Sequence, residues 1–194
     1  MTTASVMTYD SLSADVLSYL ERSDVATTQK IPTFIMLCES KISNEIKILG
    51  QMQVVTSNME VGNAVINKPA RWRETVSMNV TDPLTGNRSP VFLRKYEYLK
   101  EYWPDSNQVD KPLYYSDYDY EHWLVAPTPA TNYNFEVLFY QRVQPLDSTN
   151  QTNLFTQIAP QAMLFGTLLQ AQGYLKALDK LPVWKAYYTD CLAA

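Results

Sequence analysis

The spacing of hydrophobic residues changes twice along the chain, and this change limits the possible folds more than any other feature. In residues 1–50 and 152–194 they recur every three or four positions, which is typical of helices with one buried face. In residues 51–151 they alternate or form β-branched runs, which predicts strands. Because short amphipathic helices cannot bury their apolar faces alone, the terminal helices should pair. We therefore predict an α+β fold: residues 1–50 and 152–194 form a helical bundle, and residues 51–151 form an inserted antiparallel β-sheet or sandwich domain.

Capping residues mark the ends of the predicted helices. Thr8 suits the N-cap of the first helix, and Pro32 suits the first turn of a later helix that we expect to end at Gly50. Asn153 and Pro160 are the corresponding start signals near the C-terminus. The predicted apolar face of the helix that begins near Pro32 comprises Ile31, Phe34, Ile35, Cys38, Ile42, Ile46 and Leu49, whereas Glu39 belongs to its polar side.

The middle of the chain predicts several strands and one helix. Turn-forming residues separate the alternating segments, most clearly in Asp82–Asn87, which should join two strands as a hairpin. A short helix is expected over Tyr96–Tyr102. The predicted strands are Met52–Met59, Ala64–Ile66, Val76–Thr81, Pro90–Arg94, Leu113–Asp117, Glu121–Ala126 and Tyr133–Val143.

The segment Pro112–Pro129 contains the strongest local candidate for chemistry, because it holds Asp117, Asp119, Glu121 and the only histidine, His122. On one straight strand the three acids would share a face and could bind a hard cation or act as acid–base groups. If the chain turns near Asp119 instead, that arrangement is lost. Turn propensity favours a hairpin with its turn near residues 118–120, so we predict no catalytic or metal-binding residues.

Other site classes are excluded by what the sequence lacks. One histidine and two distant cysteines, Cys38 and Cys191, supply no zinc set, and both cysteines are expected in a helical core. No nucleotide-binding glycine motif is present, so no cofactor is expected. The net charge of −4 argues against a protein that wraps nucleic acid. No apolar run approaches the roughly 20 residues needed to cross a membrane, and no secretory signal begins the chain. We expect the protein in a cytoplasm with no membrane partner.

Aromatic residues are unusually frequent, with fourteen tyrosines and four tryptophans. Arg71 and Arg73 flank Trp72 in a basic and aromatic region that could contact nucleic acid or an acidic partner. The acidic total charge favours salt-bridged strand ends or a protein partner. The predicted protein-interface residues are Arg71, Trp72, Arg73, Tyr96, Trp103, Tyr115, Tyr118, Tyr120 and Trp123.

Several segments, in this order and spacing, resemble the head-to-tail adaptor proteins of short-tailed bacteriophages. The resemblance covers most of the chain. It is carried by PARWRET (69–75), LRKYEYLKEYWPD (93–105), PLYYSDYDYEHWLVAPTP (112–129), NFEVLFYQR (134–142) and TNLFTQIAPQAMLFGTLLQA (152–171), with YDSL (9–12) and IPTFI (31–35) near the N-terminus.

The resemblance implies a non-enzymatic virion structural protein at the head–tail junction, assembled in the host cytoplasm. It implies a homo-oligomeric ring, a dodecamer, that binds the portal protein and the tail nozzle or another tail protein. The ring would extend the channel through which genomic DNA passes during ejection, without sequence-specific binding. The alternative that remains is a carbohydrate- or cation-binding module that uses the Asp117–Trp123 hairpin.

Overall fold

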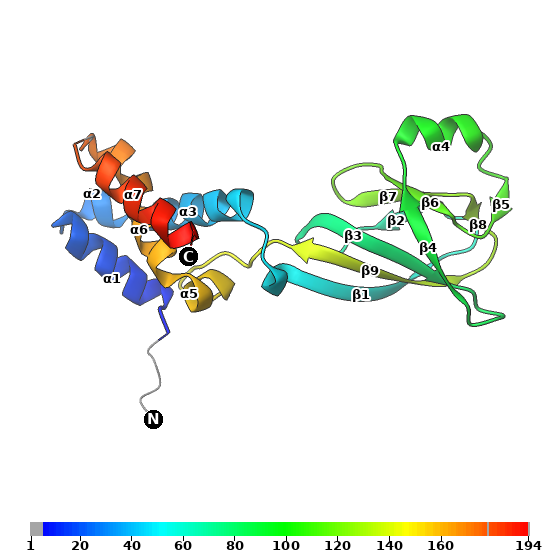
Figure 1. Cartoon of the computed structure of the whole chain (residues 1–194), viewed down its shortest axis with the longest axis horizontal. Coiled ribbons are helices and arrows are strands. Elements are labelled where there is room, and N and C mark those ends of the chain that lie inside the picture. The colour runs from blue at the N-terminus through cyan, green and yellow to red at the C-terminus, as the bar shows by residue number, and fades with distance from the viewer. Residues whose placement is uncertain (1–5, 178, 194) are drawn as a thin grey trace, which may run out of the picture. The chain divides into compact units, whose positions relative to one another are not determined.

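The computed structural model describes residues 6–177 and 179–193, and these confirm an α+β fold (Figure 1). The chain divides into two compact units, a helical unit of Met1–Gly50 with Val143–Ala194 and a sheet unit of Gln51–Arg142. The helices are α1 (Tyr9–Leu20), α2 (Val25–Thr28), α3 (Ile31–Glu45), α4 (Tyr96–Tyr102), α5 (Leu154–Ile158), α6 (Pro160–Leu175) and α7 (Leu181–Ala193), with a 3₁₀ turn η1 (Leu49–Gln51).

Two helices of the helical unit, α1 and α5, begin at capping residues that the sequence indicates. The Thr8 side chain accepts a hydrogen bond from the Ser11 N–H at 3.1 Å at the start of α1. Asn153 caps α5 in the same way, accepting from the N–H groups of Phe155 and Thr156. These contacts satisfy backbone donors that the first turn of a helix cannot bond internally.

The predicted end of the third helix is wrong. α3 ends at Glu45, because Ile46 adopts an extended conformation while its N–H still bonds to the Ile42 carbonyl. Leu49, which we assigned to the apolar face, is 80% exposed. The chain instead passes through η1 into the sheet unit.

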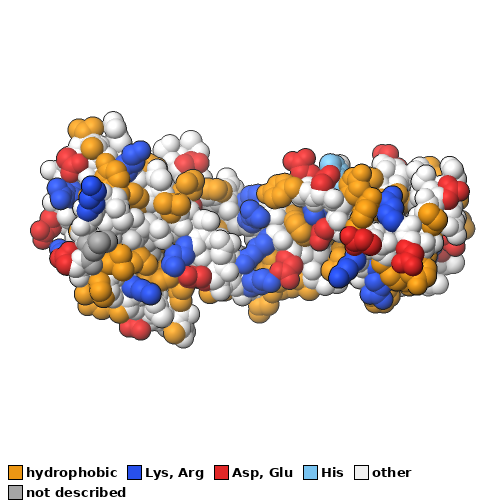
Figure 2. Space-filling model, turned by 90° about the horizontal axis from the view of Figure 1, so that it is seen from above, with side chains coloured by type: hydrophobic (Ala, Val, Ile, Leu, Met, Phe, Trp, Pro, Cys, Tyr) orange, Lys and Arg blue, Asp and Glu red, His pale blue; other side chains and the backbone are white. Residues whose placement is uncertain are grey.

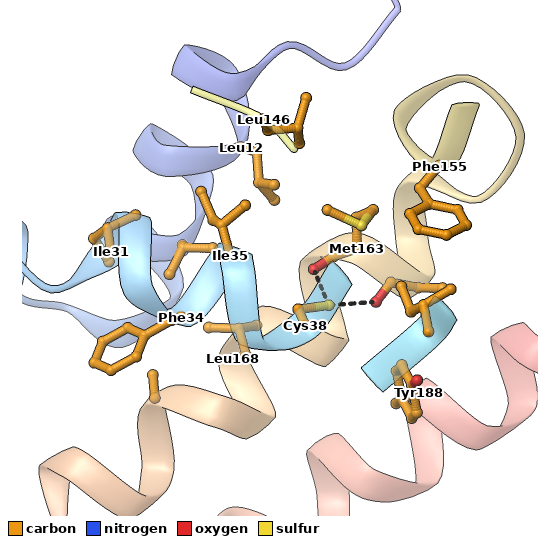
Figure 3. Close-up of a cluster of buried hydrophobic side chains, with 14 residues drawn as sticks. Leu12, Ile31, Phe34, Ile35, Cys38, Leu146, Phe155, Met163, Leu168 and Tyr188 are labelled. Atoms are coloured by element: carbon orange, nitrogen blue, oxygen red, sulfur yellow. Dashed lines mark hydrogen bonds between the residues drawn. The ribbon is translucent and has the colours of Figure 1, made fainter. Parts of the chain in front are cut away.

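The core of the helical unit is largely aliphatic (Figure 3). Ile35, Cys38 and Ile42 of α3 are fully buried, as the spacing predicts, and they face Met163 and Leu168 of α6. The thiol of Cys38 lies 3.6 Å from the Met163 carbonyl oxygen. Close packing of α3 on α6 requires Gly166, since a β-carbon there would lie 2.5 Å from Cys38 Sγ. Cys191 is only half-buried.

The prediction that Glu39 lies on the polar side of the third helix is wrong, because Glu39 is buried and only 7% exposed. Its carboxylate accepts hydrogen bonds from the Leu146 N–H and from Asn153 Nδ2. The pKa of Glu39 is raised to about 7, mainly by burial and to a smaller extent by nearby Asp147. The two hydrogen bonds act in the opposite direction. Glu39 therefore holds the segment after residue 142 against α3. The helical unit includes this segment, as part of Val143–Ala194.

The sheet unit contains a seven-stranded sheet in the order β1-β9-β3-β4-β6-β7-β2 and a two-stranded sheet of β5 and β8. The pairs are antiparallel except for β4–β6 and β5–β8, which are parallel and modify the predicted antiparallel topology. The strands are β1 (Met52–Met59), β2 (Val65–Asn67), β3 (Trp72–Thr81), β4 (Arg88–Leu93), β5 (Val109–Asp110), β6 (Tyr114–Asp117), β7 (His122–Ala126), β8 (Thr128–Pro129) and β9 (Tyr133–Gln141).

The seven-stranded sheet folds over on itself and encloses an aromatic core. Trp72 of β3 meets Trp123 of β7 edge to face, with ring centroids 6.0 Å apart. Trp123 and Val125 belong to this core, while the intervening Leu124 packs in a second cluster with Leu99 of α4. Strand β7 is thus buried on both faces, between the folded sheet and α4.

Candidate protein-interaction surfaces

The β6–β7 hairpin turns where the sequence predicts, and Asp119 organises the turn. Its carboxylate accepts the N–H groups of Glu121 and His122 at 2.7 and 2.8 Å, and it lies 2.8 Å from Nδ1 of His122. The hydrogen bond with the His122 side chain is the main cause of the lowered pKa of Asp119. The Asp119 carboxylate is therefore used within the turn. No group of three or more metal-ligating side chains converges in the part of the chain that the structure describes.

Lys68 is a central residue of this region that sequence reasoning missed. Its side chain is only 3% exposed, and its ammonium group pairs with Asp117 at 2.8 Å and donates to the Asp119 carbonyl at 2.8 Å. The same ammonium lies 3.9 Å from the centroid of the Trp72 ring, a cation–π contact. Lys68 thereby joins the segment between β2 and β3 to the β6–β7 turn. A lone lysine before Pro69 carries no sequence signal for such a role.

A surface cleft of about 470 Å³ lies beside Lys68. It brings together three of the predicted interface residues, Arg71, Trp72 and Tyr120. Arg71 adopts a left-handed backbone conformation with φ of 57°, and its carbonyl accepts the Arg142 N–H at 2.7 Å. The Arg142 guanidinium lies 5.9 Å from the centroid of the Tyr120 ring. The cleft therefore offers both aromatic rings and positive charge, with Glu121 and His122 also in its lining.

Three other predicted residues, Tyr96, Trp103 and Tyr118, lie in an aromatic surface around α4. We call this surface the α4 cluster; it comprises two groups of contacting rings, Tyr96 with Tyr118, and Tyr98, Tyr102, Trp103 and Tyr114. The rings of Tyr98 and Tyr102 are 4.5 Å apart, and those of Trp103 and Tyr114 are 5.4 Å apart. The Arg94 guanidinium lies 5.4 Å from the Tyr114 centroid. Tyr102 is 57% exposed and Tyr118 is 50% exposed, so much of this cluster faces solvent.

The remaining predicted interface residues are placed differently. Tyr115 and Trp123 are 4% and 0% exposed and form part of the sheet core, so they present no surface on the subunit. Trp123 lies on β7, which is covered on both faces, and Tyr115 lies on the neighbouring strand β6. Arg73 lies on β3 and is half-buried.

A second aromatic surface lies on the helical unit and was not among the predicted interface residues. We call it the α7 cluster; it comprises Tyr19, Phe165, Trp184 and Tyr187. The Phe165 and Trp184 rings are stacked with centroids 6.0 Å apart, and Tyr187 lies 5.1 Å from Phe165. Tyr19 and Tyr187 are each 48% exposed. Apolar side chains are visible on the surface of both units (Figure 2).

The protein family described as SU10 adaptor protein matches residues 7–194 of the chain. The chain belongs to the SU10 adaptor protein family. The match covers both units and confirms the resemblance to phage head-to-tail adaptors that the sequence carries. No curated protein sequence matches the chain.

Family membership makes the chain a structural adaptor protein of a bacteriophage, which belongs to the virion and associates with portal and tail proteins. Members of this structural family are generally not enzymes. Among the described residues, no helix is long and apolar enough to cross a membrane. The two aromatic clusters and the cleft are therefore the candidate interaction surfaces of this adaptor.

Proposed function

We propose that this adaptor assembles head to tail into a ring between the portal and the tail nozzle of a short-tailed phage. The ring is a dodecamer, as the resemblance implies, and it extends the channel through which DNA is ejected. The observation that carries the proposal is the presence of two different exposed aromatic surfaces, the α4 cluster on the sheet unit and the α7 cluster on the helical unit.

Two unlike surfaces support a ring for a geometric reason. A two-fold dimer needs one self-complementary patch, whereas a closed ring of more than two copies needs two different patches that fit each other. Exposed tyrosine and tryptophan side chains are the residue types that most often contribute binding energy to such contacts. The portal and a tail protein would bind to the remaining surfaces of the adaptor, which include the cleft with Arg71, Trp72 and Tyr120.

The charge of the chain supports passage of DNA through the ring. Tight binding to the phosphate backbone needs clustered lysine and arginine. The sequence has 16 basic and 20 acidic residues, so its net charge is −4. A channel built from such subunits would let DNA slide without sequence-specific contacts. Assembly would take place in the host cytoplasm.

Native mass spectrometry of the purified chain, alone and mixed with the purified portal protein of the same phage, tests this proposal. We expect rings with the portal present, confirmed by particle imaging. Tyr102→Ser and Tyr187→Ser should each weaken assembly by about tenfold or more, because each removes an exposed aromatic anchor. Tyr174→Ser, a tyrosine of similar exposure outside both clusters, is the control. A chain that stays monomeric and never binds the portal would contradict the proposal.

A further inference from the structure

The seven-stranded sheet is open, with β1 and β2 as its outermost strands. Strand β1 pairs with β9 along its whole length, from Met52 opposite Tyr140 to Met59 opposite Tyr133, without a register shift. Its other edge has no strand partner among the residues that the structure describes. In an antiparallel strand, alternate residues direct their N–H and C=O groups to opposite sides. About half of the backbone groups of β1 therefore point toward a vacant strand position.

The other open edges carry features that discourage strand pairing. Strand β2 has only three residues and is followed directly by Lys68 and Pro69. Strand β5 has two residues, one of them Asp110, and is followed by Lys111 and Pro112. Short length, charge and proline are the usual means by which proteins protect an exposed edge.

Strand β1 has none of these protections. Its eight residues, MQVVTSNM, include no charged residue, no proline and no glycine, and no bulge interrupts its pairing. It is accessible, because Val54 is 59% exposed and Gln53, Thr56, Ser57 and Asn58 are also exposed. A long, regular and uncharged edge of this kind is a template for an added strand.

A second copy of this chain does not supply a suitable added strand. Pairing of β1 with β1 of another copy would form a two-fold dimer, which does not propagate into a ring. The open edges of β2, β5 and β8, with three, two and two residues, are too short to pair with eight residues. The open strand edges described in a second copy therefore do not fit β1, and the portal and tail proteins with which the adaptor associates are the remaining source of an extended segment.

We propose that β1 binds an extended segment of another virion protein, the portal or a tail protein, by β-strand addition. This inference rests on the proposed function for the identity of the partner as a virion protein. Val55 and Met59 of β1 contribute to the sheet core, so the added strand should carry apolar residues at every second position beside them. It should be uncharged along the contact, because β1 offers no opposite charge. The contact spans about 27 Å for eight paired residues.

Hydrogen–deuterium exchange measured on the free adaptor and on adaptor in purified virions tests this directly. In the free chain about half of the β1 amides should exchange fast, since only the others bond to β9. In the virion the fast amides should slow by about tenfold or more, because an added strand accepts their hydrogens. Unchanged exchange in virions that contain the adaptor would overturn this inference and leave the proposed ring intact. Protection already in the free chain, together with a two-fold dimer by mass, would show self-pairing and also overturn it.

A pair of proline variants provides an independent test. Neighbouring residues of β1 direct their N–H groups to opposite edges, so of Thr56→Pro and Ser57→Pro one removes a bond to β9 and the other removes only an outward N–H. The proline variant that loses only the outward N–H can be identified because its circular dichroism spectrum and melting midpoint match those of the wild type. It should be incorporated into virions about tenfold less than wild type, and Thr56→Ser should be incorporated normally. Normal incorporation of the folded proline variant would overturn the inference.

Discussion

The helical and sheet units bury different kinds of side chain, because their helices and strands differ in how many of their faces are buried. In the helical unit each long helix has one buried face, and the core consists mainly of aliphatic side chains; Glu39 is the one buried acid among the described residues. In the sheet unit β7 is covered on both faces, and the core contains the large rings of Tyr115, Trp123 and Phe139. The comparison teaches that periodicity identifies the interior of the helices, whereas strand alternation alone does not separate interior from surface.

Trp123→Ala should have the largest effect, since it empties the centre of the sheet core. Truncation of a fully buried tryptophan costs about 3–5 kcal/mol, and Trp123 is 0% exposed. Exchange of amide hydrogens should accelerate throughout Gln51–Arg142, while the amides of α3 and α6 keep their protection, because the two units have separate cores. The control Tyr120→Ala, 69% exposed on the same hairpin, should change stability by no more than about 0.5 kcal/mol. Equal loss of protection in both units would refute separate cores.

Glu39→Gln tests whether the buried Glu39 carboxyl group makes the stability of the helical unit depend on pH. The folded-state pKa of Glu39 is raised from 4.5 to about 7, so the folded chain holds this proton more tightly than the unfolded chain. The contribution of Glu39 to the free energy of unfolding is fully present below pH 4.5 and is lost as pH rises through about 7. The total loss is about 3 kcal/mol. Glutamine has no charge to bury, so the variant should become relatively more stable as pH rises.

Chemical denaturation of wild type and Glu39→Gln at several pH values measures this difference. The exposed Glu21→Gln serves as the control in the same unit, and its difference from wild type should vary little over the range. A Glu39→Gln difference that is independent of pH would mean that burial does not raise the pKa of Glu39.

Gly166→Ala and Gly173→Ala compare a packed and an open position on the same helix. A β-carbon at Gly166 would lie 2.5 Å from Cys38 Sγ and 2.9 Å from Tyr188 Cε2. Overpacking should outweigh the better helix propensity of alanine and destabilise the helical unit by about 1–2 kcal/mol. At Gly173 nothing lies within 4 Å, so alanine should stabilise by about 0.5–1 kcal/mol. Thermal melts check both, and two changes of the same sign would contradict the packing of α3 and α7 on α6.

Asp119→Ala should have the smallest effect, because this carboxylate is exposed and acts within one turn of the sheet unit. The midpoint of thermal unfolding should fall slightly at neutral pH. The pKa of Asp119 is lowered in the folded state, so the difference from wild type should shrink as pH falls below the ordinary value of 3.8. Calcium should not raise the midpoint of wild type. Stabilisation by calcium that Asp119→Ala abolishes would favour a cation-binding module instead.

The order of helices and strands could be predicted because it depends on local spacing and turn chemistry. The hairpin turn near Asp119, the helix over Tyr96–Tyr102 and the cap at Asn153 are all local features, and the structure contains them. The end of α3 could not be predicted in this way. Gly50 is a good stop signal, but the helix stops at Glu45, before this signal is reached.

Contacts between distant segments were the least predictable part of the fold and of the candidate surfaces. Glu39 is buried because a segment more than a hundred residues later donates hydrogen bonds to it. Lys68 is buried because the β6–β7 turn closes over it. Neither partner can be identified from the residue's own neighbours in the sequence. The same limit applies to Trp123, whose burial depends on Trp72 of β3 as well as on its own hairpin.

Electron microscopy of the assembled virion neck tests the central claim most directly. The account predicts a closed ring of adaptor copies between the portal and the tail, in which each copy contacts the next through two different surfaces. A neck in which the adaptor forms two-fold dimers, or in which no adaptor lies between portal and tail, would contradict it.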